Sequence, residues 1–292
     1  MTMETLSDAV GVTKVLYRGR SNYLFKNLDW WCQQIGPDKP FLSITPEDID
    51  TGIRYLLDTP AQKYRRGSGI LPWAATRSNG TINRYVGSLA TMYKLLRVHR
   101  RLPRTFVSPV VADMKLPEGP GRTLQVTLAD VEKLVHAARL SNNKKFAALV
   151  ALACTTGLRK GSLQAMTWGD VDLVSRTIDV GRTKNGLPVR AVFPAWAGSE
   201  LRRIRPESPE SHWPVFGNKA IQTAWRYTLE RAEIPGSEGW TFHHCRHIAA
   251  SILAQSGASL PVIMQALNHK TPSMAIRYSH VNTKALEQAI TN

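Results

Sequence analysis

The helical pattern of the sequence is interrupted at residues 116–121, which read LPEGPG. Two prolines and two glycines within six positions cannot continue a helix or a strand, since proline lacks a backbone donor and glycine is conformationally loose. Helical periodicity precedes and follows this stretch. It therefore predicts a linker between two domains, and 292 residues are enough for each to bury a core. The predicted organisation is an N-terminal extension over 1–20, a helical domain over 21–115, the linker, and a second domain over 122–292.

Upstream of the linker, two segments have helical features. Residues 43–57 read as a short helix entered through a Thr-Pro pair, and residues 81–99 read as a longer one. In the longer segment apolar side chains recur at helical spacing, and Arg84 and Thr91 lie on the opposite face. That opposite face predicts either a surface that enters a DNA groove or an ordinary solvated surface.

Downstream of the linker, the sequence predicts a mainly helical domain with one small sheet. Thr127 and Asp130 have capping-box spacing. The β-rich residues 176–180 and 187–193 flank an Asn-Gly pair at 185–186, a strong hairpin signal. Helices are expected over residues 127–138, 142–154, 220–232, 243–255, 260–267 and 272–280. The expected fold class is therefore mainly α: a helical domain followed by an α-rich mixed domain with a small antiparallel β-sheet.

The composition points to a polyanionic partner. Lys and Arg outnumber Asp and Glu by 38 to 22, a formal net charge of +16, and both predicted domains are basic. Nucleic acid is the partner that such a charge favours. Three widely spaced cysteines indicate neither a disulfide framework nor a paired-cysteine zinc site. With no apolar run near the ~20 residues needed to cross a bilayer and no signal-peptide core, we expect a cytoplasmic, nucleoid-associated protein without membrane contact.

Two basic residues stand at turns that suit phosphate chemistry. Arg159 ends the run TGLR at 156–159, just beyond an expected buried helix, and its planar guanidinium matches phosphate oxygens. Lys184 stands directly before the Asn-Gly turn, at the tip of the expected hairpin. From there it would reach into DNA and protonate a leaving oxygen. Taken alone, each also fits a solvated surface residue.

A histidine-rich run at residues 243–247, HHCRH, contains a further candidate pair. A helix would place His243 and Arg246 on one face. If Thr241 is the N-cap, both lie in the first turn, where the helix dipole favours a phosphate. A metal site through His243 and His247 and a packed histidine cluster are the alternatives. The metal interpretation lacks neighbouring carboxylates and paired cysteines, so the phosphate interpretation ranks above it, and no metal or cofactor is expected.

The last two candidates follow in the C-terminal part. His269 comes after Asn268, and asparagine is, after glycine, the residue best suited to the left-handed conformation that ends a helix. Tyr278 lies on a short expected helix, where a lone tyrosine is ordinarily core. With the residues above, however, it completes a set sufficient for metal-free phosphoryl transfer: two arginines, two histidines, a lysine acid and a tyrosine nucleophile.

In their order and spacing, these motifs closely resemble the active-site signature of the tyrosine recombinase, or phage integrase, family. The motifs are TGLR at 156–159, Lys184 on a hairpin, HxxR at 243–246, LxH at 267–269 and RYSH at 277–280. The resemblance spans roughly residues 122–280. More loosely, residues 44–49 and 81–85 resemble the family's helical core-binding domain.

The resemblance implies a site-specific DNA recombinase that works through a 3′-phosphotyrosyl intermediate. Tyr278 would be the nucleophile and Lys184 the proton donor to the leaving oxygen, with phosphate-stabilising roles for Arg159, His243, Arg246 and His269. The implied partners are double-stranded DNA recombination sites, further protomers in a tetramer on DNA, and accessory DNA-bending proteins. The candidate DNA contacts outside the site are Arg84, Thr91, Arg182 and Arg190.

Two residues depart from the family pattern. Ser162 stands where an acidic residue usually follows the first arginine, and Asn268 replaces the usual glycine. Many phage integrases also carry an arm-binding domain, and about twenty residues before the first plausible helix are too few for one, so that module is expected to be missing, truncated or never present. Three rival functions remain: a type IB topoisomerase, a DNA-binding protein that has lost catalysis, and a metal-dependent nuclease.

Overall fold

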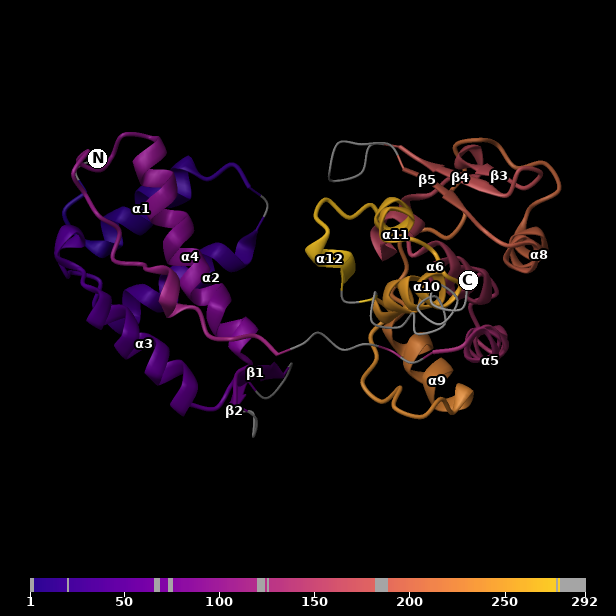
Figure 1. The fold of residues 1–292 in the computed structure, drawn as a ribbon, viewed down its shortest axis with the longest axis horizontal. Helices are drawn as coiled ribbons and strands as arrows, with labels where there is room; N and C mark the ends of the chain where they lie inside the picture. The colour runs from indigo at the N-terminus through magenta and orange to yellow at the C-terminus, as the bar shows by residue number, and fades with distance from the viewer. Residues whose placement is uncertain are drawn as a thin grey trace, which may run out of the picture. The chain divides into compact units, whose positions relative to one another are not determined.

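The computed structural model describes residues 3–19, 21–65, 69–72, 76–119, 124, 126–181, 189–276 and 278. It divides the chain into two compact units, Met1–Gly119 and Pro120–Asn292 (Figure 1). Each unit has its own apolar core. Among the helices described, none is long and apolar enough to cross a bilayer.

The first unit is helical, with a two-stranded hairpin in its described part. Its elements are α1 (Leu6–Leu16), α2 (Asn22–Ile35), α3 (Pro46–Asp58), β1 (Gln62–Arg65), β2 (Gly69–Pro72) and α4 (Asn79–Val98). Helices α1, α2 and α3 all pack against α4. Trp31 of α2 is fully buried, and its Nε1 donates a 2.9 Å hydrogen bond to the carbonyl oxygen of Tyr85 in α4. The two helices expected in this part are confirmed as α3 and α4.

The stretch expected to precede the first helix instead carries α1. Thr5 caps this helix in a capping box with Asp8, whose backbone nitrogen donates to the threonine hydroxyl at 3.2 Å. Leu6 and Ala9 are fully buried in the core of the first unit. The prediction that residues 1–20 form an extension outside the helical domain is therefore wrong, because residues 6–16 form a helix that belongs to the core of this domain. Gly11 and several β-branched residues lower its intrinsic helix propensity, and packing against α2 and α4 outweighs that deficit.

The second unit is built around a helix that is apolar on every side. Its elements are α5 (Leu128–Arg139), α6 (Phe146–Thr156), α7 (Lys160–Ala165), β3 (Val171–Asp172), β4 (Thr177–Val180), β5 (Val189–Val192), α8 (Ala195–Ile204), α9 (Gln222–Ala232), α10 (His244–Gln255), α11 (Leu260–Leu267) and α12 (Ser273–Ile276). In α6 every residue except Thr155 is buried, because α5, α8 and α10 pack around it (Figure 1). Such an all-apolar helix belongs in a core.

The small sheet of this unit is antiparallel, with the strand order β3-β4-β5. Thr177 pairs with Val192 and Val180 with Val189, so β4 and β5 form the expected hairpin. Its predicted turn, with Arg182 and Lys184, lies outside the described residues. The expected fold class, mainly α with a small antiparallel sheet, is confirmed. The sequence did not predict the helices α7 and α8, the strand β3 or the β1-β2 hairpin.

Candidate active site

Arg246 holds three segments of the second unit together. It lies in the first turn of α10 and is 7% exposed. Its Nη1 donates a 2.8 Å hydrogen bond to the carbonyl oxygen of Gly157, and its Nη2 donates to the carbonyl oxygen of Leu267. Those carbonyls lie at the ends of α6 and α11. The arginine therefore joins the segments that carry Arg159 and His269.

Both helix ends are turned by a residue in the left-handed conformation. Gly157 closes α6 at φ 63°, ψ 13°, and Arg159 follows as the residue that begins α7. Asn268 closes α11 at φ 48°, ψ 53°, which confirms the prediction that this asparagine ends a helix. The backbone nitrogen of His269 then donates to the carbonyl oxygen of Met264 at 2.9 Å. Arg159 and His269 thus lie two residues and one residue, respectively, beyond a left-handed turn.

The Gly157→Ala variant should lower the free energy of unfolding by about 1–3 kcal/mol. Gly157 has a positive φ, and an added Cβ would lie 2.4 Å from Leu267 Cδ2 and 3.3 Å from Ala249 Cβ. The matched control is Gly161→Ala in α7, where an added Cβ meets nothing within 4 Å. That variant should equal or exceed the stability of the parent, because alanine is the better helix former. Denaturant unfolding measures both, and a Gly157→Ala variant as stable as the parent would contradict the assigned turn.

Two arginine charges are concentrated at this junction. Burial, followed by the charge of Arg159, lowers the pKa of Arg246 to about 10, so Arg246 remains a cation at neutral pH. Within the described residues, no carboxylate forms an ion pair with Arg159 or Arg246. Two neighbouring cations without a carboxylate favour an incoming anion, since it would relieve their repulsion. The junction is therefore suited to a phosphate.

His243 lies beside this pair at the start of α10. The structure makes His243, and not the expected Thr241, the N-cap residue. The reason is that the backbone nitrogen of Thr241 donates to the ring of His244 at 2.9 Å, so a turn precedes the helix. Desolvation, and then the charges of Arg246, His244 and Arg159, lower the pKa of His243. At neutral pH its ring is therefore a neutral hydrogen-bond donor and not a third cation.

Tyr278 is buried beside the same helix, with only 3% of its surface exposed. Its hydroxyl lies 2.5 Å from Nδ1 of His247 in α10. The aromatic rings of His243 and His247 are 5.5 Å apart. Tyr278 belongs to a buried apolar cluster whose other members are Ala250, Ala254, Ile263, Leu267 and Ala275. The tyrosine therefore combines a core position with a polar contact to the histidine-rich run.

The sequence did not predict this contact of His247. From the sequence alone, His247 is a candidate partner of His243 in a metal site or a member of a packed histidine cluster. No group of three or more His, Cys, Asp or Glu that could hold a metal occurs among the described residues. What determines the role of His247 is its distance to Tyr278, and that depends on how α10 packs near α12.

The other candidates lie elsewhere. Arg190 on β5 makes a two-pronged ion pair with Asp179 on β4, at 3.0 and 3.2 Å. Ser162 lies in α7, and its backbone nitrogen bonds the carbonyl oxygen of Arg159 at 2.9 Å. In the first unit, Arg84 and Thr91 of α4 line a hollow of about 830 Å³ with polar and aromatic residues of α2. Arg84 and Thr91 belong to the first unit, whereas Arg190 belongs to the sheet of the second.

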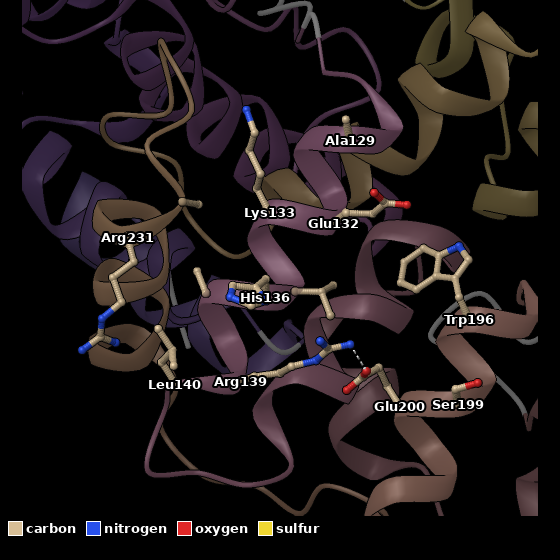
Figure 2. Close-up of a pocket in the computed structure, with 13 residues that line it drawn as sticks. Ala129, Glu132, Lys133, His136, Arg139, Leu140, Trp196, Ser199, Glu200 and Arg231 are labelled. Carbon is tan, nitrogen blue, oxygen red and sulfur yellow. Dashed lines mark hydrogen bonds and ion pairs between the residues drawn. The ribbon is translucent and has the colours of Figure 1, made fainter.

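The second unit also has a separate pocket of about 730 Å³ between α5, α8 and α9 (Figure 2). Arg139 and Glu200 form an ion pair on its wall, and Glu200 is 4% exposed. Of the predicted catalytic residues, the five that the structure describes do not line it. The chemistry is therefore assigned to the junction around Arg246, where the polar side chains converge, and not to this pocket.

Comparison with known proteins places the second unit in a described family. The model of the phage integrase family matches residues 125–285. A shufflon-specific DNA recombinase from Escherichia coli is 26% identical over 207 residues, which are 70% of this chain and 52% of the relative. A tyrosine recombinase XerD from Yersinia pestis is 29% identical over 153 residues, 48% and 51% of the two chains. This chain spans about half the length of the curated relatives that it matches.

Solved structures share the fold at low sequence identity. The integrase of transposon Tn1549 in complex with transposon right end DNA gives a TM-score of 0.71 at 14% identity, covering 98% of both chains. A lambda integrase dimer bound to a COC′ core site gives a TM-score of 0.64 at 19% identity, covering 96% of this chain and 97% of the other. These similarities extend over both units.

Proposed function

The chain belongs to the phage integrase family of tyrosine recombinases, and we propose that it is a site-specific DNA recombinase that cleaves and rejoins DNA through Tyr278. The observation that carries this proposal is the position of the Tyr278 hydroxyl, which lies 2.5 Å from Nδ1 of His247. His247 lies on α10, the helix that also carries the buried cation Arg246. Attack on a phosphodiester requires a nucleophile beside cations, and no described carboxylate neutralises Arg159 or Arg246.

In the proposed reaction, the Tyr278 oxygen attacks the scissile phosphorus. A 3′-phosphotyrosyl bond forms and the 5′ oxygen leaves as a hydroxyl. Arg159 and Arg246, with His269 and neutral His243 as further donors, stabilise charge on the non-bridging oxygens, and Lys184 protonates the leaving oxygen. The new bond retains the energy of the phosphodiester, so rejoining by the 5′ hydroxyl needs no ATP.

The proposed partner is duplex DNA. The net charge of +16 supports this, as do the solved relatives that are described in complex with DNA. We propose that the first unit, Met1–Gly119, which includes α1, acts as a core-binding domain, with α4 presenting Arg84 and Thr91 to a groove, and that residues 122–292 are the catalytic domain. Exchange of strands between two sites would use a tetramer on DNA, with accessory DNA-bending proteins as further partners, in the cytoplasm of a bacterial or phage-infected cell.

The test is a search for covalent protein–DNA adducts. Purified protein is incubated with duplex fragments of the genomic DNA that flanks its gene, and the reaction is stopped with detergent. Fragments that remain attached to protein are recovered and sequenced. A recombinase should yield adducts at defined phosphates, with the protein on the 3′ side of the break. Breaks without attached protein, abolished by a chelator, would instead indicate a metal-dependent nuclease.

DNA binding should weaken steeply as salt is added. A protein that neutralises Z phosphates releases their counterions, so the slope of log K against log salt is about −0.9Z for duplex DNA. A basic clamp on a whole half-site should therefore give a slope of several units. Fluorescence anisotropy with a labelled duplex at increasing NaCl measures it. A slope near one would mean that the positive charge of this protein is not used on DNA.

A further inference from the structure

We propose that His247 is the group that accepts the proton of the Tyr278 hydroxyl when this oxygen attacks phosphorus. The inference rests on the proposed function, because it requires Tyr278 to be the nucleophile. It adds a catalytic residue to the six expected from the sequence, since the ring of His247 contacts the reacting oxygen itself.

The geometry fits direct proton transfer. Nδ1 of His247 lies 2.5 Å from the Tyr278 hydroxyl, at the short end of the range for hydrogen bonds of this kind. The proposed transfer uses the tautomer of His247 with its ring proton on Nε2, in which the Tyr278 hydroxyl donates and Nδ1 accepts. His247 follows Arg246 directly in α10, a helix that packs tightly against α6. The acceptor is therefore held on a rigid element.

The neighbouring charge favours the ionised tyrosine. Arg246 is close enough to Tyr278 for the two to interact electrostatically, and a cation stabilises a phenolate more than a phenol. In model peptides, tyrosine and histidine titrate near about 10 and 6.5. Complete transfer of the proton from Tyr278 to His247 before the attack is therefore unfavourable in free energy. The arginine charge and the forming phosphorus–oxygen bond reduce this difference as the reaction proceeds.

The step balances in both directions. During cleavage, the O–H bond of Tyr278 breaks towards Nδ1, the bond from its oxygen to phosphorus forms, and the bond from phosphorus to the 5′ oxygen breaks. That oxygen takes a proton from Lys184. During rejoining, the 5′ hydroxyl attacks, Lys184 recovers its proton, and the imidazolium of His247 returns its proton to Tyr278. No oxidant, metal or further reactant is consumed.

Other ionisable groups surround this pair and must be separated from it. The groups on α10, on the helix ends beside it and on α6 are His243, His244, Cys245, Arg246, Arg159, His269 and Cys154. The rings of His243 and His244 lie 5.5 and 5.8 Å from that of His247. A pH profile of the parent alone therefore does not identify the acceptor, and variants at position 247 are needed.

The experiment compares two substitutions that divide positioning from proton transfer. His247→Leu removes the contact, whereas His247→Asn places an amide oxygen near the Nδ1 position that accepts a hydrogen bond but not a proton. The matched control is His244→Asn on the same helix, because His244 contacts Thr241 and stacks on Trp240. Single-turnover formation of the covalent adduct is measured on duplex DNA with a bridging 5′-sulfur, which leaves without a proton. On this substrate, the proton transfer that can still limit the rate is the one from the Tyr278 hydroxyl.

Both variants at position 247 should form the adduct on the order of 10²-fold more slowly than the parent, the lower range for general acid–base catalysis. The parent rate should rise with pH through the titration of a histidine and then level off. His247→Asn should lose that rise, and His244→Asn should keep it. Anisotropy with the labelled duplex should be unchanged in all three variants, which shows that they bind. Each variant should still unfold cooperatively, and His247→Leu should lose about 1 kcal/mol of unfolding free energy because it removes the hydrogen bond to Tyr278.

Two results would overturn the proposal. If His247→Asn forms the adduct at the parent rate, His247 merely holds the tyrosine and another group takes the proton. If His247→Leu is slow but the rise with pH persists in His247→Asn, the titrating group is one of the neighbouring histidines. Failure of the proposed function would look different, because the parent would then form no adduct, or Tyr278→Phe would still form one.

Discussion

Tyr278→Phe is expected to abolish covalent adduct formation while duplex DNA binding stays at the parent level. The substitution removes only the hydroxyl that lies 2.5 Å from His247, so the aromatic packing of a side chain that is 3% exposed is retained. Loss of one hydrogen bond from a buried partner should cost about 1 kcal/mol of unfolding free energy. Detergent-resistant adducts, anisotropy and denaturant unfolding measure the three properties on the same preparation.

Tyr227→Phe is the matched control, because Tyr227 is the next tyrosine to examine as a nucleophile. It lies on α9 with 44% of its surface exposed, and the guanidinium of Arg226 is 5.0 Å from its ring. It thus has an arginine beside it but none of the candidate histidines. Tyr227→Phe should form adducts at the parent rate. Adducts that persist in Tyr278→Phe and disappear in Tyr227→Phe would move the nucleophile to α9.

Local sequence signals predicted much of the fold because they act over a few residues. The Thr127–Asp130 capping box begins α5 as expected, with the Thr127 nitrogen 3.0 Å from the carboxylate. The asparagine at 268 ends α11. The elements that were missed depend on distant packing. In α8, Gly198 weakens the helical signal, yet an added Cβ there would lie 3.1 Å from Phe193, so the glycine permits a close approach.

The candidate site was predictable as a set of residues but not as an arrangement. The order of the motifs identified Arg159, His243, Arg246 and His269 as partners, but the one local rule among them is the i, i+3 spacing of His243 and Arg246. Arg246 reaches a carbonyl 89 positions away in sequence, and His247 meets a hydroxyl 31 positions away. Contacts at such separations follow from how α6, α10 and α11 pack, which a single sequence does not specify. For that reason the sequence indicates for His247 only a metal site or a packed histidine cluster, and not its contact with Tyr278.

Lys184→Ala is expected to slow DNA cleavage on the order of 10²–10⁴-fold, the usual contribution of a general acid. The residue stands before the Asn-Gly pair that connects β4 and β5, in a segment outside the described residues, so its assignment rests on the hairpin and on the family resemblance. Binding of duplex DNA should be nearly unchanged, because one cation contributes little to an interface that neutralises many phosphates. Single-turnover cleavage and anisotropy separate the two effects.

A substrate with a bridging 5′-sulfur at the scissile phosphate tests directly whether Lys184 is the general acid. A thiolate leaves without a proton, so this substrate should restore most of the rate that Lys184→Ala loses. Arg159→Ala and Arg246→Ala are the contrasting variants. They should stay slow on the sulfur substrate, because they lose stabilisation of charge on the non-bridging oxygens, which the leaving group does not replace. If sulfur rescues the arginine variants and not Lys184→Ala, the acid must instead be sought among His243, His269 and Arg182, because the lysine would then act before the departure of the leaving group.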